Sequence, residues 1–156
     1  MPSSKRQLDL QTADQVIAEI EHLRSAGYTK LKNWNLTQAC EHLQMTMNGG
    51  MNGFGFRLPW IARATVMKWV FGWMLRNRKM ISAPTIKKLK PVSLPDQDND
   101  PLIDECIATI RTAESFAGPI ENYPMLDDLS VDTWQQLMWL HAAHHLGFLI
   151  PSQETV

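Results

Sequence analysis

The segment Leu140-His141-Ala142-Ala143-His144-His145-Leu146 has the pattern of a helix and holds three of the five histidines of the chain. Residues four apart on an α-helix share a face, with their Cβ atoms about 5–6 Å apart. His141 and His145 can therefore direct two imidazoles at one point, which is how a helix chelates a transition metal. Two histidines do not complete a tight site, so a third ligand has to come from another element.

The bulk composition is that of a globular protein. The chain has 156 residues, of which 44% are hydrophobic and 20% charged, and this excludes a disordered or fibrous class. The formal net charge of −1 gives no reason to expect binding to nucleic acid. We expect a single domain over residues 1–156, with its core between about residues 9 and 148.

Charge is distributed unevenly along the chain. Residues 57–90 carry nine Lys or Arg and no acid, whereas the residues after 90 carry eleven Asp or Glu against one basic residue, Arg111. This asymmetry is typical of a surface for an anionic partner, and equally of two helices that face each other across a bundle. We favour the second interpretation.

Cysteine use and hydropathy indicate a cytoplasmic protein. Cys40 and Cys106 form no C-x-x-C pattern, so we expect two reduced, largely buried thiols in a reducing compartment. Residues 1–10 are polar and lack the apolar core of a signal peptide. The most apolar run, residues 58–75, is interrupted by two basic residues, so we expect a core or at most interfacial helix and no integral membrane segment.

Caps and apolar spacing predict an all-α fold, with four or five helices around one core and no convincing strand. The predicted segments run from about Thr12 to Ala26, from Asn35 to the glycine-rich stretch 48–56, from Pro59 to about Asn77, from Asp100-Pro101 to Gly118-Pro119, and from Ser130 to Gly147. Residues 80–98 contain three prolines, which predicts an irregular, long crossover along the outside of a helical bundle.

Two histidines outside the C-terminal segment are candidates for the third ligand. His22 belongs to a Glu19-x-x-His22 unit, but a di-iron bundle needs two such units and the chain has one, so we expect a solvated side chain. His42 lies near the edge of the apolar face of the second predicted helix. A lone histidine there is most often a surface or boundary residue, but this helix can pair with the one that carries His141 and His145.

Three segments, in this order, resemble a DinB/YfiT-like four-helix-bundle protein, and more narrowly a bacterial branch of that superfamily whose function is undefined. The resemblance covers roughly Asp9 to Phe148. Its segments are Gly27-Tyr28 through Asn33-Trp34-Asn35-Leu36 to Glu41-His42-Leu43, then Arg78-Lys79-Met80 followed by Pro84, and finally His141-Ala142-Ala143-His144-His145-Leu146.

This resemblance implies a metal site and a class of chemistry. In the superfamily, a histidine on the second helix and a His-x-x-x-His pair on the last helix bind one divalent metal, which implies His42, His141 and His145 as ligands here. Imidazole ligands favour zinc or nickel, with iron as a further candidate. Characterised relatives include metal-dependent hydrolases and thiol transferases, which implies a small-molecule substrate and, for a transferase, a low-molecular-weight thiol. Relatives often dimerise, so a homodimer is one expectation, and the oligomeric state stays open.

The residues leave the mechanism open. A bound metal can lower the pKa of water or of a thiol to near neutrality, but the sequence offers no clear general base. Glu41 adjoins His42 and points about 100° away from it on a helix, so it is a weak candidate. His144 is rotated in the same way from His145, and we interpret it as a pocket-lining or helix-boundary residue.

Two other hypotheses compete with a metal-dependent enzyme. One is a non-catalytic binding or scaffold protein with a degenerate metal site, in which the histidines are structural. The other is a membrane-surface or anionic-partner role for the basic segment 57–90 with Trp60, Trp69 and Trp73. Buried core aromatics are the commoner explanation of those tryptophans.

Overall fold

The computed structural model describes residues 4–83 and 85–152. Pro84, one of the residues that carry the resemblance, and the two ends of the predicted domain lie outside this part. The helices are α1 (Ala13–Ala26), α2 (Leu36–Asn52), α3 (Trp60–Ala64), α4 (Val66–Asn77), α5 (Asp100–Ser115) and α6 (Val131–Leu146); η1 (Lys87–Leu89) is a 3₁₀ turn, and β1 (Tyr28–Lys30) and β2 (Leu149–Pro151) are short strands.

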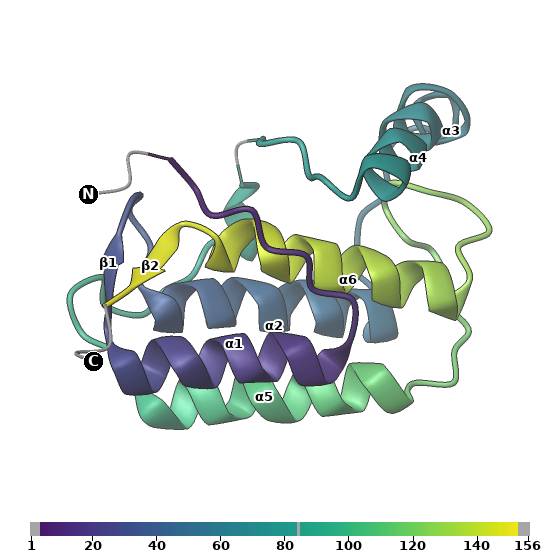
Figure 1. The fold of residues 1–156 in the computed structure, drawn as a ribbon. Coiled ribbons are helices and arrows are strands. Elements are labelled where there is room, and N and C mark those ends of the chain that lie inside the picture. The colour runs from purple at the N-terminus through teal and green to yellow at the C-terminus, as the bar shows by residue number, and fades with distance from the viewer. Residues whose placement is uncertain (1–3, 84, 153–156) are drawn as a thin grey trace.

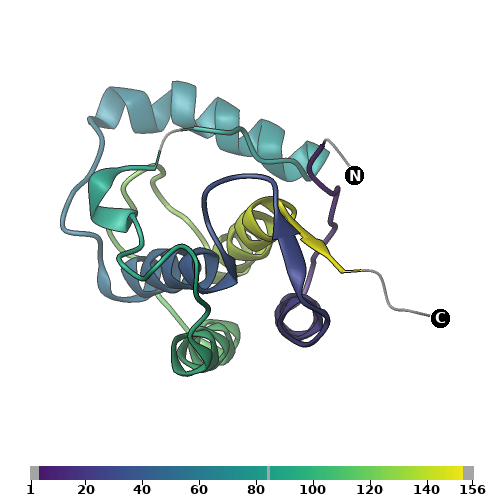
Figure 2. The same ribbon diagram turned by 90° about the vertical axis from the view of Figure 1, so that its left-hand side faces the viewer.

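Four of the helices form a bundle around one apolar core (Figure 1). Viewed end-on in Figure 2, their order around the bundle is α1, α6, α2 and α5. Fully buried side chains come from each of them, including Ile20, Leu43, Ile110 and Leu137. The predicted all-α bundle is therefore confirmed, with residues between α4 and α5 as the long crossover, and the two cysteines are buried as expected.

Local capping explains where the bundle helices begin. The Asn35 side chain accepts a hydrogen bond from the Gln38 N–H (2.8 Å), while the Gln38 side chain accepts one from the Asn35 N–H (3.0 Å). This reciprocal pair satisfies two backbone donors that a helix N-terminus otherwise leaves unpaired. The predicted cap of α5 is wrong by one residue, because Asn99 is the cap and Asp100 is already helical.

The prediction that the chain has no strand is wrong. β1 follows α1 and β2 follows α6, and they pair antiparallel with Thr29 opposite Ile150. Each strand has three residues, which is too short for a period-two pattern to emerge from the sequence. This two-stranded sheet connects the C-terminal end of α1 to the C-terminal end of α6.

The glycine-rich stretch 48–56 ends α2 as expected, with Gly53 as the cap, but the helix first runs through Gly49 and Gly50 to Asn52. Tertiary packing explains why glycine stands at these positions. A Cβ on Gly50 would lie 2.3 Å from the indole Nε1 of Trp134 on α6, and a Cβ on Gly49 would lie 2.4 Å from the Phe54 ring. The missing side chain of Gly50 lets α2 and α6 approach closely at this end of the bundle.

Residues 58–75 do not form one core helix, so the first of the two expectations for this run is wrong, and the interfacial alternative stays a prediction. The segment breaks at Thr65 into α3 and α4, which lie outside the four-helix bundle (Figure 1). Trp60 and Trp69 are each 67% exposed, and Met74 is the one fully buried residue of the two helices. No helix among the described residues is long and apolar enough to cross a membrane.

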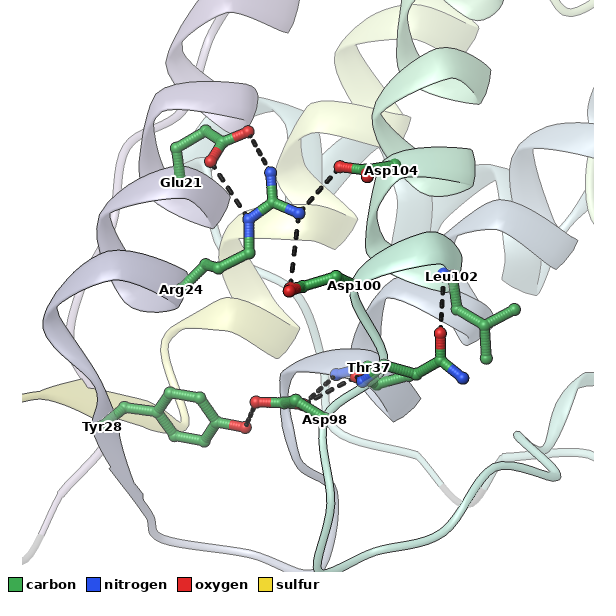
Figure 3. Close-up of polar contacts among 9 residues, drawn as sticks. Glu21, Arg24, Tyr28, Thr37, Asp98, Asp100, Leu102 and Asp104 are labelled. Carbon is green, nitrogen blue, oxygen red and sulfur yellow. Dashed lines mark hydrogen bonds and ion pairs between the residues drawn. The ribbon is translucent and has the colours of Figure 1, made fainter.

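The uneven charge distribution does not reflect two helices facing each other, because α4 lies away from α5. Asp100 and Asp104 of α5 instead face Arg24 of α1, whose guanidinium lies 3.6 Å and 2.7 Å from their carboxylates (Figure 3). Part of the basic segment is neutralised elsewhere, since Arg57 and Arg63 both contact Asp127.

The crossover is fastened along one side of α2 by side chains at helical spacing. The Asn35 amide donates to the carbonyl of Leu94 (2.9 Å), and the Gln38 amide donates to the carbonyl of Ser93 (3.2 Å). The carboxylate of Glu41 accepts from the Ser93 backbone N–H (3.1 Å) and from its hydroxyl. The irregular crossover thus has a fixed path past α2.

Asp98 anchors the end of the crossover (Figure 3). One carboxylate oxygen accepts from the backbone N–H (3.0 Å) and the hydroxyl (2.7 Å) of Thr37, and the other accepts from the Tyr28 hydroxyl (2.6 Å). This carboxylate therefore joins the start of α2, the strand β1 and the approach to α5.

Two glycine-to-alanine changes separate packing from helix propensity. Gly50→Ala places a methyl group against Trp134 and should lower the free energy of unfolding by about 1–3 kcal/mol. Gly72→Ala in α4 meets no atom within 4 Å, so the ordinary helix preference for alanine should leave stability unchanged or raise it by up to about 1 kcal/mol. Urea unfolding measures both; equal effects would contradict the packing account of Gly50.

Candidate metal centre

The structure brings His42 of α2 together with His141 and His145 of α6. The Nε2 atom of His141 lies 3.1 Å from Nε2 of His42 and 3.0 Å from Nε2 of His145. One ligand atom from each of the three histidines lies within 4.8 Å of the other two. Nitrogens on a tetrahedral zinc ion, with bonds of about 2.0–2.1 Å, are on the order of 3.3 Å apart. The two distances that involve Nε2 of His141 are within a few tenths of an ångström of this separation.

The other ring nitrogen of two histidines is held by the protein. Nδ1 of His42 donates to the Leu89 carbonyl at 2.8 Å. Nδ1 of His141 lies 3.4 Å from the hydroxyl oxygen of Thr46, which itself donates to the carbonyl of Leu43 at 2.8 Å. With Nδ1 protonated, each Nε2 presents a lone pair to the cluster centre, as metal-bound histidines require.

Sequence reasoning did not identify these supporting groups. Thr46 follows His42 by four residues and therefore shares its face of α2, so helical spacing could have indicated it. The Leu89 carbonyl belongs to the crossover, whose path depends on side-chain contacts with α2, and no sequence pattern marks it.

Trp34 covers the cluster on one side. Its indole stacks on His145 with ring centroids 5.3 Å apart and an interplanar angle of 27°, and its centroid lies 5.0 Å from that of His42. Trp34 therefore limits how the two imidazoles can rotate.

The surroundings keep the cluster uncharged at neutral pH. Burial lowers the pKa of His42, although its hydrogen bond to the Leu89 carbonyl acts in the opposite direction. Burial lowers the pKa of His141 and His145 further, and repulsion between the neighbouring imidazoles adds to this effect. Neutral imidazole is the form that binds a metal.

Three other residues considered from the sequence do not belong to the group of converging nitrogens. His22 is exposed on α1, as expected. Glu41, the weak candidate for a general base, is engaged by Ser93 of the crossover instead. His144 points elsewhere than its neighbour His145: its Nδ1 accepts from the Lys5 ammonium at 2.8 Å. Burial, followed by the charge of Lys5, lowers the pKa of His144 to about 4.

A cavity of about 190 Å³ adjoins the cluster. His145 and Trp34 form part of its wall, together with His144, Lys32 and Phe148. A second cavity, of about 180 Å³, lies on the other side of His144 and includes Lys5 in its wall. The three-histidine cluster thus has one member, His145, at the edge of a space that can hold a small molecule.

The lowered histidine pKa values predict how stability depends on pH. The unfolded chain takes up protons below about pH 6.5, where the folded cluster does not, so metal-free protein should lose stability as the pH falls from about 7 to 5. Urea unfolding at a series of pH values measures this loss. The loss should be smaller in His42→Gln/His145→Gln and unchanged in the exposed control His22→Gln; equal slopes in all three proteins would contradict the assignment.

Comparison with known proteins identifies a family without a defined function. No curated protein and no solved structure matches the chain. One family model, described as "Protein of unknown function (DUF1569)", matches residues 2–152, nearly the whole sequence. The chain therefore belongs to the DUF1569 family.

Proposed function

We propose that this protein binds one divalent metal ion through Nε2 of His42, His141 and His145. The observation that carries the proposal is the convergence of these three nitrogens, with Nδ1 of His42 and His141 turned outward onto protein acceptors. Zinc and nickel suit three neutral imidazoles best, and iron is the further candidate.

We also propose that the DUF1569 family is a branch of the DinB/YfiT-like superfamily. Two features support this placement: the four-helix bundle with a long crossover, and the distribution of the histidines. One histidine lies on the second helix of the chain and a His-x-x-x-His pair lies on the last, as the resemblance implies.

Within this proposal, the protein is a metal-dependent hydrolase or thiol transferase that acts on a small molecule. Three protein ligands leave a coordination position open, and the metal would supply a water or thiol that is ionised near neutral pH. The chain's own contribution is positional. The Leu89 carbonyl and Thr46 fix two of the imidazoles, Trp34 shields them, and the cavity beside His145 admits the substrate.

A non-catalytic binding or scaffold role is the second candidate, and one observation favours it. Among the described residues, no Asp or Glu is hydrogen-bonded to the three histidines, and the neighbouring Glu41 is occupied by the crossover. A metal site without a nearby carboxylate lacks the most common partner for proton transfer.

Elemental analysis of untagged protein as purified tests the metal proposal. We expect near-stoichiometric zinc, nickel or iron in the wild type, loss of the metal in His42→Ala/His145→Ala, and retention in His22→Ala, which removes an exposed histidine. Protein that is metal-free and takes up none of the three ions when they are offered would overturn the proposal and favour the binding role. A metal-loaded wild type would justify a screen for hydrolase and thiol-transferase activity.

A further inference from the structure

Two lysines from distant parts of the chain meet beside the cavity that adjoins the histidine cluster. Lys5 precedes α1 and Lys32 follows β1, yet both ammonium groups lie over the ring of Phe148, at 5.2 Å and 4.4 Å from its centroid. Lys32 lines the cavity directly. Lys5 reaches it through His144, which lies between the two cavities.

These lysines lack a counter-charge within the described part of the chain. Neither forms an ion pair with Asp or Glu there, and no acidic side chain lines either cavity. The nearby basic residues differ in this respect, since Arg6 pairs with Glu19 and Arg78 with Asp9. Burial and the charge of Lys32 both lower the pKa of Lys5. The two like charges repel each other, and an anion close to them would relieve this repulsion.

We propose that the cavity beside His145 is a subsite for an anionic group, a carboxylate or a phosphate, held by Lys32 and His144, with Lys5 acting through His144. Because Lys5 donates to Nδ1 of His144, the imidazole carries its proton on Nε2 and is a further donor. This inference deepens the proposed metal-dependent function, because it gives the small-molecule substrate a negative charge next to the metal position.

Calorimetric titration with two probes, succinate and inorganic phosphate, tests the subsite in protein freed of metal by chelation and dialysis. We expect Lys32→Gln to weaken binding by about tenfold or more, since it removes a charged donor from the cavity wall. Lys5→Gln should weaken binding less, because Lys5 acts through His144 and does not line this cavity. Lys68→Gln, an exposed lysine of α4, is the matched control and should bind as the wild type does. Succinamide, the uncharged analogue of succinate, should not bind.

The outcomes separate the subsite from the metal site. Absence of binding to both probes in the wild type, or equal binding by wild type and Lys32→Gln, overturns the subsite. A further outcome is that succinate binds only after zinc is added, and equally well to wild type and Lys32→Gln. That result overturns the subsite and leaves the metal proposal intact. Lysine-dependent binding in a protein that takes up no metal supports the subsite and rejects the metal proposal.

A separate observation concerns the outer face of α3 and α4. Val66, Trp69, Val70 and Trp73 recur at the spacing of one helix face. The opposite face of α4 carries Phe71 and Leu75, which pack against the core. With the exposed Trp60 of α3, the helices present tryptophans to solvent from a basic segment. Three of its nine basic residues form ion pairs, Arg57 and Arg63 with Asp127 and Arg78 with Asp9.

We infer that this face docks on an anionic lipid surface. Tryptophan prefers the membrane–water interface, and basic side chains nearby add about 1 kcal/mol each on an anionic leaflet. The positive charge complements lipid headgroups, whereas a second copy of the same face would bring like charges together. Exposed Lys68 and Arg76 on α4 provide part of this charge, because neither forms an ion pair among the described residues.

Co-sedimentation with lipid vesicles tests this docking. We expect binding to vesicles that contain phosphatidylserine, weaker binding at high salt, and little binding to phosphatidylcholine alone. Trp60→Ser/Trp69→Ser should lose binding, whereas Leu94→Ser, which changes an exposed apolar residue of the crossover, should retain it. No binding at low salt overturns the inference. So does a dimer in sedimentation velocity that the tryptophan changes dissociate, because the face would then be a self-interface.

Discussion

Buried imidazole nitrogens need hydrogen-bond or metal partners, and this requirement shapes the contact between α2 and α6. His42 is only 4% exposed, so each of its ring nitrogens has to find a partner inside the protein. One nitrogen uses the crossover backbone at Leu89, and the other faces His141. The position of the crossover and the spacing of the two helices are therefore linked through a single side chain.

The polar side of α2 makes that link rigid. Asn35, Gln38 and Glu41 hold the crossover at Ser93 and Leu94, a few residues after Leu89, and Asp98 fixes its end. An irregular segment normally offers a mobile backbone carbonyl, which is a poor orienting group. Here the carbonyl that orients His42 is part of a bonded network, so the imidazole direction is set by the same contacts that set the fold.

Sequence periodicity and helix caps were sufficient to predict the bundle helices, because apolar spacing and the capping residues Asn35 and Ser130 act locally. His141 and His145 were predictable as a pair for the same reason, since four-residue spacing is a property of one helix. The addition of His42 came from resemblance to a family, because its distance from α6 depends on tertiary packing. The strands, the Leu89 carbonyl and the lysine pair also depend on contacts between distant segments, and none leaves a local pattern.

The misplacement of residues 58–75 has a different physical cause. A hydrophobic segment is stabilised when its apolar surface is removed from water, but its sequence does not specify which surface covers it. The four-helix core closes without α3, and the outer tryptophans stay exposed. A pattern that is typical of a buried helix can therefore equally mark a helix whose covering partner is another molecule.

The three-histidine cluster can form only late in the synthesis of the chain. His42 and His141 are 99 residues apart in sequence, and the helices between them in the chain do not supply a substitute for α6. A nascent chain that has folded α1, α2 and α5 still leaves one face of α2, with its histidine, open to the surroundings. Because contacts of such long range form late, the cluster closes only after α6 has been made, and premature termination anywhere before this helix leaves an imidazole without its partners.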